Sequence, residues 1–222
     1  MSTQDSATYL LMNSRSDIFV SCRRSHLDIH LRRVRSKIYG NVLDVGGRRI
    51  NRRGAFVPPI DSVKSWTVVN PDEVERADVT GGLPNLPFED GVFDTVVCTE
   101  VLEYIEKPAD AIQEMARVLT PRGTLYLSVP FLHVLHGDAS VDCFRFTSTY
   151  IRRQAEACFL RVEIFPMGGI ASVIFDLMWQ RLRCYRLFRP LLRTLGPIVV
   201  RRDRPASDIT TGFFVVASTP RL

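Results

Sequence analysis

The chain has 222 residues, of which 45% are hydrophobic and 24% charged, as in an ordinary globular protein rather than a disordered one. Its formal net charge of +5 suits an anionic partner, such as a phosphorylated substrate, nucleic acid or an acidic membrane surface, and suits simple solubility equally well. The five cysteines are scattered, without a CxxC pair or a Cys/His spacing typical of zinc, so we expect a reducing, cytoplasmic setting and no bound metal.

The N-terminal part, residues 1–39, is predicted to be a helical extension of a single domain that spans residues 1–222. Its first residues lack the basic start and apolar core of a signal peptide. Apolar residues recur at helical spacing from about Asp17 to Ile38, and Gly40 ends the pattern. No apolar run in the sequence is long and charge-free enough to span a bilayer.

Short apolar strands then alternate with helical segments. We expect helices near residues 108–119 and 147–158, and strands at residues 41–45, 66–70, 93–98, 124–129, 160–165 and 212–218. This alternation predicts an α/β fold with a Rossmann-like, doubly wound and mainly parallel sheet. Ligands of such folds bind beyond the carboxyl ends of the strands.

The first of these strands ends in a short glycine loop, in which Asp44 and Val45 precede Gly46 and Gly47. Glycines let the backbone approach a ligand closely, and a nearby carboxylate can accept a hydrogen bond or balance a cation. A glycine pair after a strand is by itself more often a tight turn. The loop is therefore interpreted together with the motifs that follow it.

Two later segments carry such motifs. Residues 83–98 read LPNLPFEDGVFDTVVC and are followed by TEVLEYI, and residues 114–125 read EMARVLTPRGTL. In their residues, order and spacing these segments resemble the class I S-adenosylmethionine (SAM)-dependent methyltransferases, specifically the type 11 methyltransferase domain. The resemblance covers about half of the chain. It implies SAM as the cofactor and a last strand that runs antiparallel to the rest of the sheet.

The resemblance also implies the residues that hold SAM. In this family the glycine loop contacts the methionine end of SAM, and further contacts come from the end of the second strand, from an acid ahead of Val79 and Thr80, and from the residues after the fourth strand. Asp44 would help to hold the amino group, and Asp78 would accept a hydrogen bond from the adenine amino group. The expected cofactor-binding residues are Asp44, Gly46, Gly47, Asn70, Asp78, Val79, Thr99 and Glu100.

The sequence departs from the family pattern at two places. Arg48 and Arg49 stand where a third glycine is usual, and Asn70 stands where a carboxylate usually binds both ribose hydroxyls. An amide oxygen can make one such bond, and Asp72 could reach back for the other. Loss of cofactor binding, which would leave a non-catalytic relative, is therefore kept as an alternative.

Residues 128–147 resemble a subset of the family in which this segment lies near the transferred methyl group. A nucleophile that carries a proton needs a base, and His136 is the first candidate and His133 the second. Asp142 and Arg145 are expected to form an ion pair that shapes the segment, and Thr147 to cap the next helix. The other interpretation is a structural lid without a base.

Residues 168–205 are predicted to be a helical insertion, or cap, before the last strand. The insertion is rich in leucine and aromatic residues, with arginines spaced through it. Four interpretations are open: a buried helix with snorkelling arginines, which ranks first, a cap over the substrate, a dimer surface, and peripheral membrane contact through residues 170–204.

The preferred prediction is a SAM-dependent methyltransferase that acts on a hydroxyl, or less readily an amine, of a small molecule or of a glycan or lipid-linked intermediate. Methylation of RNA or protein and a non-catalytic binding or partner protein are the alternatives. No nucleic-acid partner is expected, because aromatic residues do not interleave with the basic runs as base stacking requires. The expected location is the cytoplasm, with membrane association as a variant of it.

Overall fold

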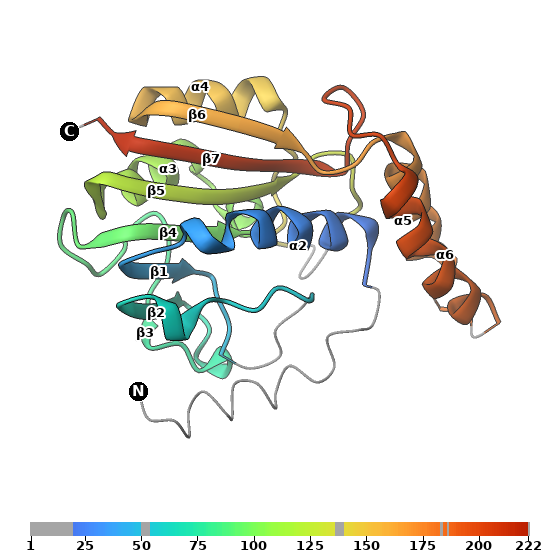
Figure 1. Ribbon diagram of the computed structural model, residues 1–222, viewed down its shortest axis with the longest axis horizontal. Coiled ribbons are helices and arrows are strands. Elements are labelled where there is room, and N and C mark those ends of the chain that lie inside the picture. Colours follow the sequence, from blue (N-terminus) through green and yellow to red (C-terminus); the bar gives the residue numbers. More distant parts are fainter. Residues whose placement is uncertain (1–19, 50–53, 136–139, 183, 186, 222) are drawn as a thin grey trace.

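The computed structural model describes residues 20–49, 54–135, 140–182, 184–185 and 187–221. A seven-stranded sheet with strand order β3-β2-β1-β4-β5-β7-β6 forms its centre (Figure 1). The strands are β1 (Asn41–Val45), β2 (Ser65–Asn70), β3 (Val79–Thr80), β4 (Phe93–Thr99), β5 (Leu119–Pro130), β6 (Phe159–Pro166) and β7 (Gly212–Pro220). β7 runs antiparallel to β5 and β6, and the other neighbouring pairs are parallel. The predicted fold class is confirmed.

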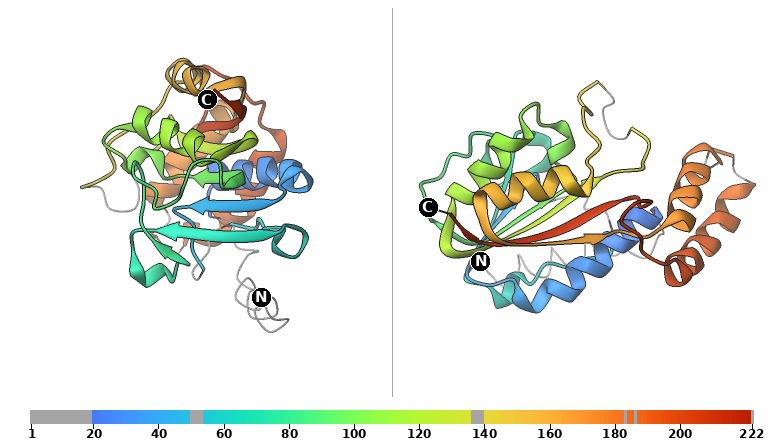
Figure 2. Two further views of the ribbon diagram at one scale, coloured as in Figure 1. Left: turned by 90° about the vertical axis from the view of Figure 1, so that its left-hand side faces the viewer. Right: turned by 90° about the horizontal axis from the view of Figure 1, so that it is seen from above.

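Helices cover both faces of the sheet. The α-helices are α2 (Cys22–Val34), α3 (Pro108–Arg117), α4 (Ser148–Cys158), α5 (Ile170–Leu182) and α6 (Phe188–Arg202), and short 3-10 turns are η1 (Arg35–Lys37), η2 (Ile60–Ser62), η3 (Glu73–Glu75) and η4 (Leu102–Tyr104). Figure 2 shows α3 and α4 on one face of the sheet and α2 on the other. This arrangement makes the fold doubly wound.

Each face of the sheet carries its own apolar core, because successive side chains of a strand point to opposite faces. Leu43 of β1 packs with Met115 of α3 in the core on one side. Its neighbour Val42 packs with Leu27 and Leu31 of α2 in the core on the other side. Strands buried on both faces read as continuous apolar runs, and the sequence shows such runs at β1 and β4.

The start of α2 is set by contacts on its first turn. Ser21 caps the helix, since its hydroxyl accepts a hydrogen bond from the Arg24 amide at 3.1 Å. The amides of Cys22 and Arg23 donate to the carboxylate of Asp176 in α5, at 2.6 and 2.9 Å. The described helix therefore begins at residue 22 rather than near residue 17, and residues 17–19 lie outside the described part of the chain.

The other elements match the sequence prediction closely, with two differences. β3 was not predicted, because a strand of two residues is too short to show alternation. β5 begins at Leu119, which pairs with Phe93 of β4, so α3 ends two residues earlier than expected. The cap of α4 is confirmed, because the Thr147 hydroxyl accepts a hydrogen bond from the Tyr150 amide at 3.2 Å.

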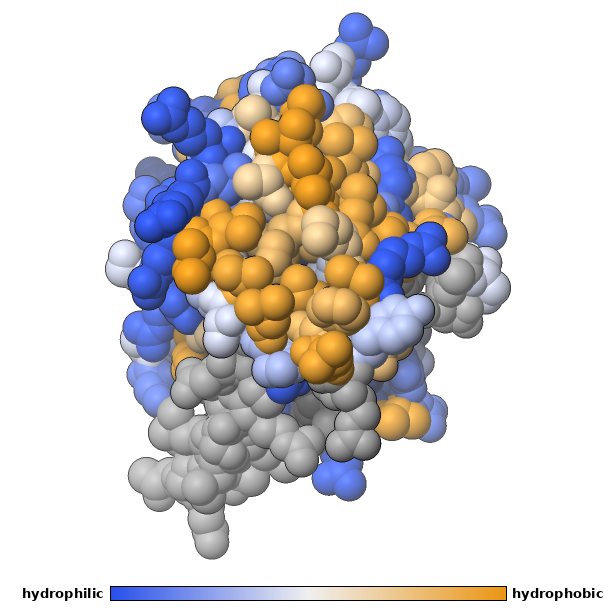
Figure 3. Space-filling view, turned by 90° about the vertical axis from the view of Figure 1, so that its right-hand side faces the viewer, coloured by the Kyte–Doolittle hydropathy of each residue, from blue (hydrophilic) through white to orange (hydrophobic). Residues whose placement is uncertain are grey.

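The insertion forms the helix pair α5 and α6, which stands beyond the end of the sheet where β6 finishes and β7 starts (Figure 1). The structure leaves the outward side of this pair exposed, contrary to the interpretation that ranked first. Ile174 and Leu177 of α5 and Leu191 of α6 are among the exposed side chains, and Figure 3 shows the apolar surface that they help to form.

The side chain of His30 in α2 lies against two phenylalanines of the sheet. Its ring stacks on Phe214 with centroids 5.1 Å apart, and the Phe165 ring lies 5.8 Å away. Burial, aided by the charge of Arg33, lowers the pKa of His30 from 6.5 to about 4. The neutral ring is therefore the form that the fold stabilises.

We predict that His30 makes the fold sensitive to acid. Because its pKa is lower in the folded chain than in the unfolded one, its contribution to stability is complete above pH 6.5 and is lost as the pH falls towards 4. After allowance for solvent, the loss should be about 2 kcal/mol relative to His30→Phe. Urea unfolding of both proteins across this pH range measures it, and parallel pH profiles would contradict the prediction.

Candidate cofactor and acceptor site

The glycine loop after β1 lies at the carboxyl edge of the sheet, as predicted. The Gly46 amide donates to the Val69 carbonyl of β2 at 2.8 Å, and Gly46 has a φ of +68°, which glycine adopts without strain. A Cβ atom on Gly46 would overlap the Val101 side chain. Glycine is thus required here by the turn and by the close approach of the segment after β4.

Asp44 places a buried carboxylate beneath this loop. Its Oδ2 accepts a hydrogen bond from the Trp66 indole at 3.3 Å, and a Cβ atom on Gly47 would overlap the same carboxylate. The second glycine therefore gives the acid room next to the loop backbone. This position suits an ammonium group, and the contact between Asp44 and the amino group of SAM stays a prediction.

Asn70 connects the end of β2 to the glycine loop. Its Nδ2 donates to the Gly47 carbonyl at 2.9 Å, and its Oδ1 accepts from the Asp72 amide at 2.9 Å. A carboxylate could not make the first of these bonds, because it has no donor. Asparagine in place of the family's usual acid therefore has a structural cause, because its amide nitrogen donates to the glycine loop. Asp72 caps η3 through the Val74 amide at 3.0 Å.

The two arginines in place of the third glycine also fasten the loop. Arg48 pairs with Glu75 at 2.7 Å, and Arg49 pairs with Asp78 and donates to the Trp66 carbonyl at 2.9 Å. Two charged contacts thus hold a segment in which the family more often has a flexible glycine.

Asp78 lies just before β3. Its Oδ2 accepts a hydrogen bond from the Val68 amide at 2.7 Å and contacts Arg49. The next residue, Val79, is half-buried and packs on the core beside α3. Both of these contacts use Oδ2, and the roles of both residues at the adenine stay predictions.

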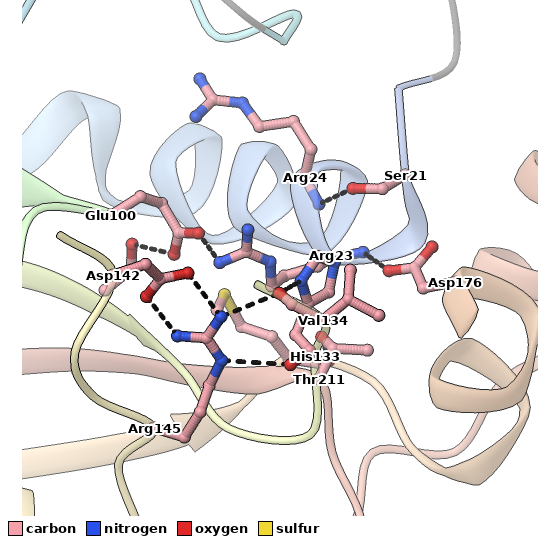
Figure 4. Close-up of polar contacts among 12 residues, drawn as sticks. Ser21, Arg23, Arg24, Glu100, His133, Val134, Asp142, Arg145, Asp176 and Thr211 are labelled. Carbon is pink, nitrogen blue, oxygen red and sulfur yellow. Dashed lines mark hydrogen bonds and ion pairs between the residues drawn. The ribbon is translucent and has the colours of Figure 1, made fainter. Parts of the chain in front are cut away.

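Thr99 and Glu100 lie at the carboxyl end of β4, where cofactor contacts were expected. Glu100 has a φ of +59°, a conformation that costs a non-glycine residue about 1 kcal/mol or more. Its amide donates to the Ser128 carbonyl at 3.2 Å, and its Oε1 accepts from the Ser128 hydroxyl at 2.9 Å. Its other oxygen pairs with the guanidinium of Arg23 (Figure 4). These contacts hold the strained backbone in place.

Arg23 was not among the expected site residues. It lies on the first turn of α2 and is buried, and this burial lowers its pKa to about 10 against the opposing effect of Glu103 and Asp176. It remains charged at neutral pH. A positive charge is unfavourable at a helix N-terminus, so arginines in the first turn after the N-cap Ser21 are a sequence signal for an acidic partner that was not used above.

The expected ion pair of Asp142 with Arg145 is confirmed. The two groups form a bidentate contact of 2.6 and 2.7 Å, and hydrogen bonding to Asp142 raises the pKa of Arg145. The same guanidinium donates to the carbonyls of His133 at 3.1 Å and Val134 at 2.8 Å. Arg145 therefore holds together the two ends of the segment that follows β5 (Figure 4).

Of the two candidate bases, the structure describes His133, while His136 lies outside the described residues. Nδ1 of His133 lies 2.9 Å from the Val134 carbonyl oxygen. Because a carbonyl can only accept, Nδ1 carries the proton, and in the neutral ring the lone pair is on Nε2. This is the tautomer that a base using Nε2 requires. Figure 4 shows His133 beside Arg145, near the pair of Arg23 and Glu100.

Comparison with known proteins agrees with this geometry. A family model described as a methyltransferase domain matches residues 50–127. Ubiquinone biosynthesis O-methyltransferase of Paracidovorax citrulli (strain AAC00-1) is 31% identical over 105 residues, which cover 39% of this chain and 42% of that protein. The chain thus spans less than half the length of this relative.

Two solved structures share the fold. A SAM-dependent methyltransferase from Thermotoga maritima matches with a TM-score of 0.56 at 14% identity, covering 97% of this chain and 95% of that one. The [4+2]-cyclase SpnF matches with a TM-score of 0.53 at 13% identity, covering 87% and 80%. In the matched domain and in the strand order with its antiparallel β7, the chain is similar to the class I SAM-dependent methyltransferases.

Proposed function

We propose that this protein binds SAM at the carboxyl ends of β1, β2 and β4 and transfers a methyl group to the hydroxyl of a small molecule or of a glycan or lipid-linked intermediate. The observation that carries the proposal is the glycine loop, with a buried carboxylate at Asp44 and no side chain at Gly46 and Gly47. The similarity to an O-methyltransferase supports a hydroxyl as the acceptor.

The residues at this edge fit such a cofactor. The negative Asp44 suits the ammonium of the methionine part, and the bare backbone of the two glycines allows it to approach closely. Thr99 and Glu100 would line the pocket at the end of β4. When bound, SAM supplies a methyl group that is already activated, so most of the acceleration comes from holding the acceptor in line with it.

The protein's chemical task is then to hold the acceptor and take its proton. In the neutral tautomer of His133, Nε2 can accept the proton of the acceptor hydroxyl while the oxygen attacks the methyl carbon. His136, the first candidate base in the sequence, follows three residues later and could take the same role. Arg145 donates to the carbonyls of His133 and of the next residue, Val134, and these contacts would keep the ring in position.

A binding protein that kept the fold without catalysis is the second candidate. Asn70 favours it, because both ends of its amide already serve the glycine loop and the Asp72 turn. SpnF, which shares this fold, is a [4+2]-cyclase. The two candidates differ in a simple observable, which is transfer of a labelled methyl group from SAM to an added acceptor.

The first prediction concerns cofactor binding. We expect the wild-type chain to bind SAM and its demethylated product, and Asp44→Asn to weaken binding of SAM about tenfold to a hundredfold, since an ammonium loses its charged partner. Isothermal titration calorimetry measures both. The control is Asp90→Asn, an exposed acid in the turn before β4 at the opposite edge of the sheet, which should bind as the wild type does. Absence of binding to the wild-type chain would refute the proposal.

The second prediction concerns Asn70. We expect Asn70→Asp, which restores the carboxylate usual in the family, to weaken SAM binding. The substitution removes the donor to the Gly47 carbonyl and puts a negative charge against that carbonyl. The unfolding free energy should fall by about 1–3 kcal/mol. Asn70→Ala separates the lost donor from the added charge and should be affected less. Tighter binding of SAM to Asn70→Asp would contradict this account of the residue.

The third prediction concerns the base. If a histidine removes the proton, His133→Asn or His136→Asn should lower turnover about a hundredfold or more while the dissociation constant for SAM stays unchanged. Turnover is measured by mass spectrometry with methyl-labelled SAM and a panel of phenols, sugars, polyprenyl-linked hydroxyl compounds and amines. Normal turnover in both variants would remove the histidines from the mechanism, and methylation of amines alone would correct the acceptor class.

A further inference from the structure

The outward side of the α5–α6 pair forms a large apolar surface, which we call the α5–α6 face. Figure 3 shows it as a continuous apolar area with hydrophilic residues around its edge. Its exposed members come from both helices and the turn between them. They are Ile170, Ile174, Leu177, Met178, Tyr185, Leu187, Phe188, Leu191, Leu195 and Ile198, of which Leu187 is 81% exposed. Contiguous surfaces of this kind mark sites of interaction with a protein or a membrane.

This face is not the side that holds the insertion to the rest of the molecule. Phe175, Trp179 and Leu192 point inward and form a small core with Cys22 of α2. The pair is thus apolar on two sides, one of which is packed and one exposed. A helix that is hydrophobic all round is usually buried on all sides, so we expect another molecule to cover the exposed side.

The charge of the insertion indicates which kind of molecule covers the α5–α6 face. Residues 170–204 contain eight arginines and two aspartates, a net charge of +6, whereas the whole chain carries +5. The rest of the chain therefore has a net charge of −1. Both aspartates are engaged internally, Asp176 with the start of α2 and Asp203 with the amides of Gly169 and Ser172 at 2.6 and 3.0 Å.

The exposed arginines belong to the same insertion as the exposed apolar residues. Arg181, Arg201, Arg202 and Arg204 are exposed in the described part of the insertion. Apolar side chains flanked by arginines suit a bilayer interface, with the apolar groups among the acyl chains and the guanidinium groups at the level of the phosphates. A second copy fits this face less well, because two surfaces of the same positive charge would repel each other.

We propose that the α5–α6 face docks on an anionic lipid surface. None of the helices in the described residues has the length and hydropathy needed to cross a bilayer. In this proposal the helix pair lies on the membrane surface. The docking stands on the exposed apolar residues and on the arginines, and it does not depend on methyl transfer.

Docking in this position would bring the candidate acceptor site close to the lipid. The insertion connects the carboxyl end of β6 to the start of β7, where Gly212 pairs with Pro130 at the end of β5. Asp176 of α5 holds the N-terminus of α2, from which Arg23 contacts Glu100. An acceptor that is itself held in the membrane would then reach the site without leaving it.

The test is co-sedimentation of the full chain with vesicles of phosphatidylcholine alone and of phosphatidylcholine mixed with phosphatidylglycerol. We expect binding to the mixed vesicles and at least about tenfold weaker binding to the neutral ones, since each arginine near an anionic surface contributes to the attraction. Added salt should weaken the binding, because it screens charges at the surface. Equal binding to both vesicles, or none to either, would overturn the proposal.

Paired variants separate the apolar and charged contributions. Ile174→Gln with Leu191→Gln, and separately Arg201→Glu with Arg202→Glu, should each lower the partition onto mixed vesicles about tenfold or more. The matched controls lie on the body of the sheet, away from the insertion. They are Leu160→Gln with Val92→Gln, and Arg153→Glu with Arg161→Glu, all at exposed positions. Circular dichroism checks that all four proteins are folded.

The competing occupant gives a different result. If the face joins two copies, light scattering should show a dimer that Ile174→Gln with Leu191→Gln converts to a monomer, with no binding to vesicles. That outcome would replace the lipid surface by a second copy. Equal loss of vesicle binding in the test variants and their controls would overturn the assignment of the face.

Discussion

The largely buried ion pair between Arg23 and Glu100 is the contact on which the rest of this end of the molecule depends. It joins the first turn of α2 to the carboxyl end of β4, and the same turn is held from the other side by Asp176 of the insertion. Leaving one member of a buried pair without its partner typically costs about 3–5 kcal/mol. Helix, sheet edge and insertion therefore form one mechanical unit, and the strained backbone at Glu100 persists because this unit holds it.

Polar side-chain contacts also hold the glycine loop in place. Asn70, Arg48 and Arg49 each connect the loop to the segments around β2 and β3. A loop fixed in this way loses less conformational entropy when a ligand binds, since much of the ordering has already occurred on folding. The absent third glycine and the absent ribose acid are in this sense one feature, a loop that is tied down by polar contacts.

The sequence predicted the elements whose signal is local and missed the contacts that join distant segments. The apolar runs at β1 and β4 gave these strands to within one residue, and the polar pair Asp142 and Arg145 was recognised because its members lie three residues apart. The link of Arg23 to Glu100 and the donation from Asn70 to Gly47 connect residues 77 and 23 positions apart in the chain. No periodicity reports such pairs, so only the fold reveals them. The exposure of the insertion was ranked below its burial for a related reason, since apolar spacing does not tell which side of a helix is covered.

The distribution of charge separates two roles that the sequence had combined. At the sheet edge, Arg23 and Arg145 each face a carboxylate, so the positive charges there are balanced within the site. The excess positive charge belongs to the insertion, where the two aspartates are used internally. A net positive charge attracts the insertion towards anionic partners, because exposed charges set the long-range electrostatic field. The positive charge of the chain is thus concentrated in the insertion, apart from the ion pairs of the candidate site.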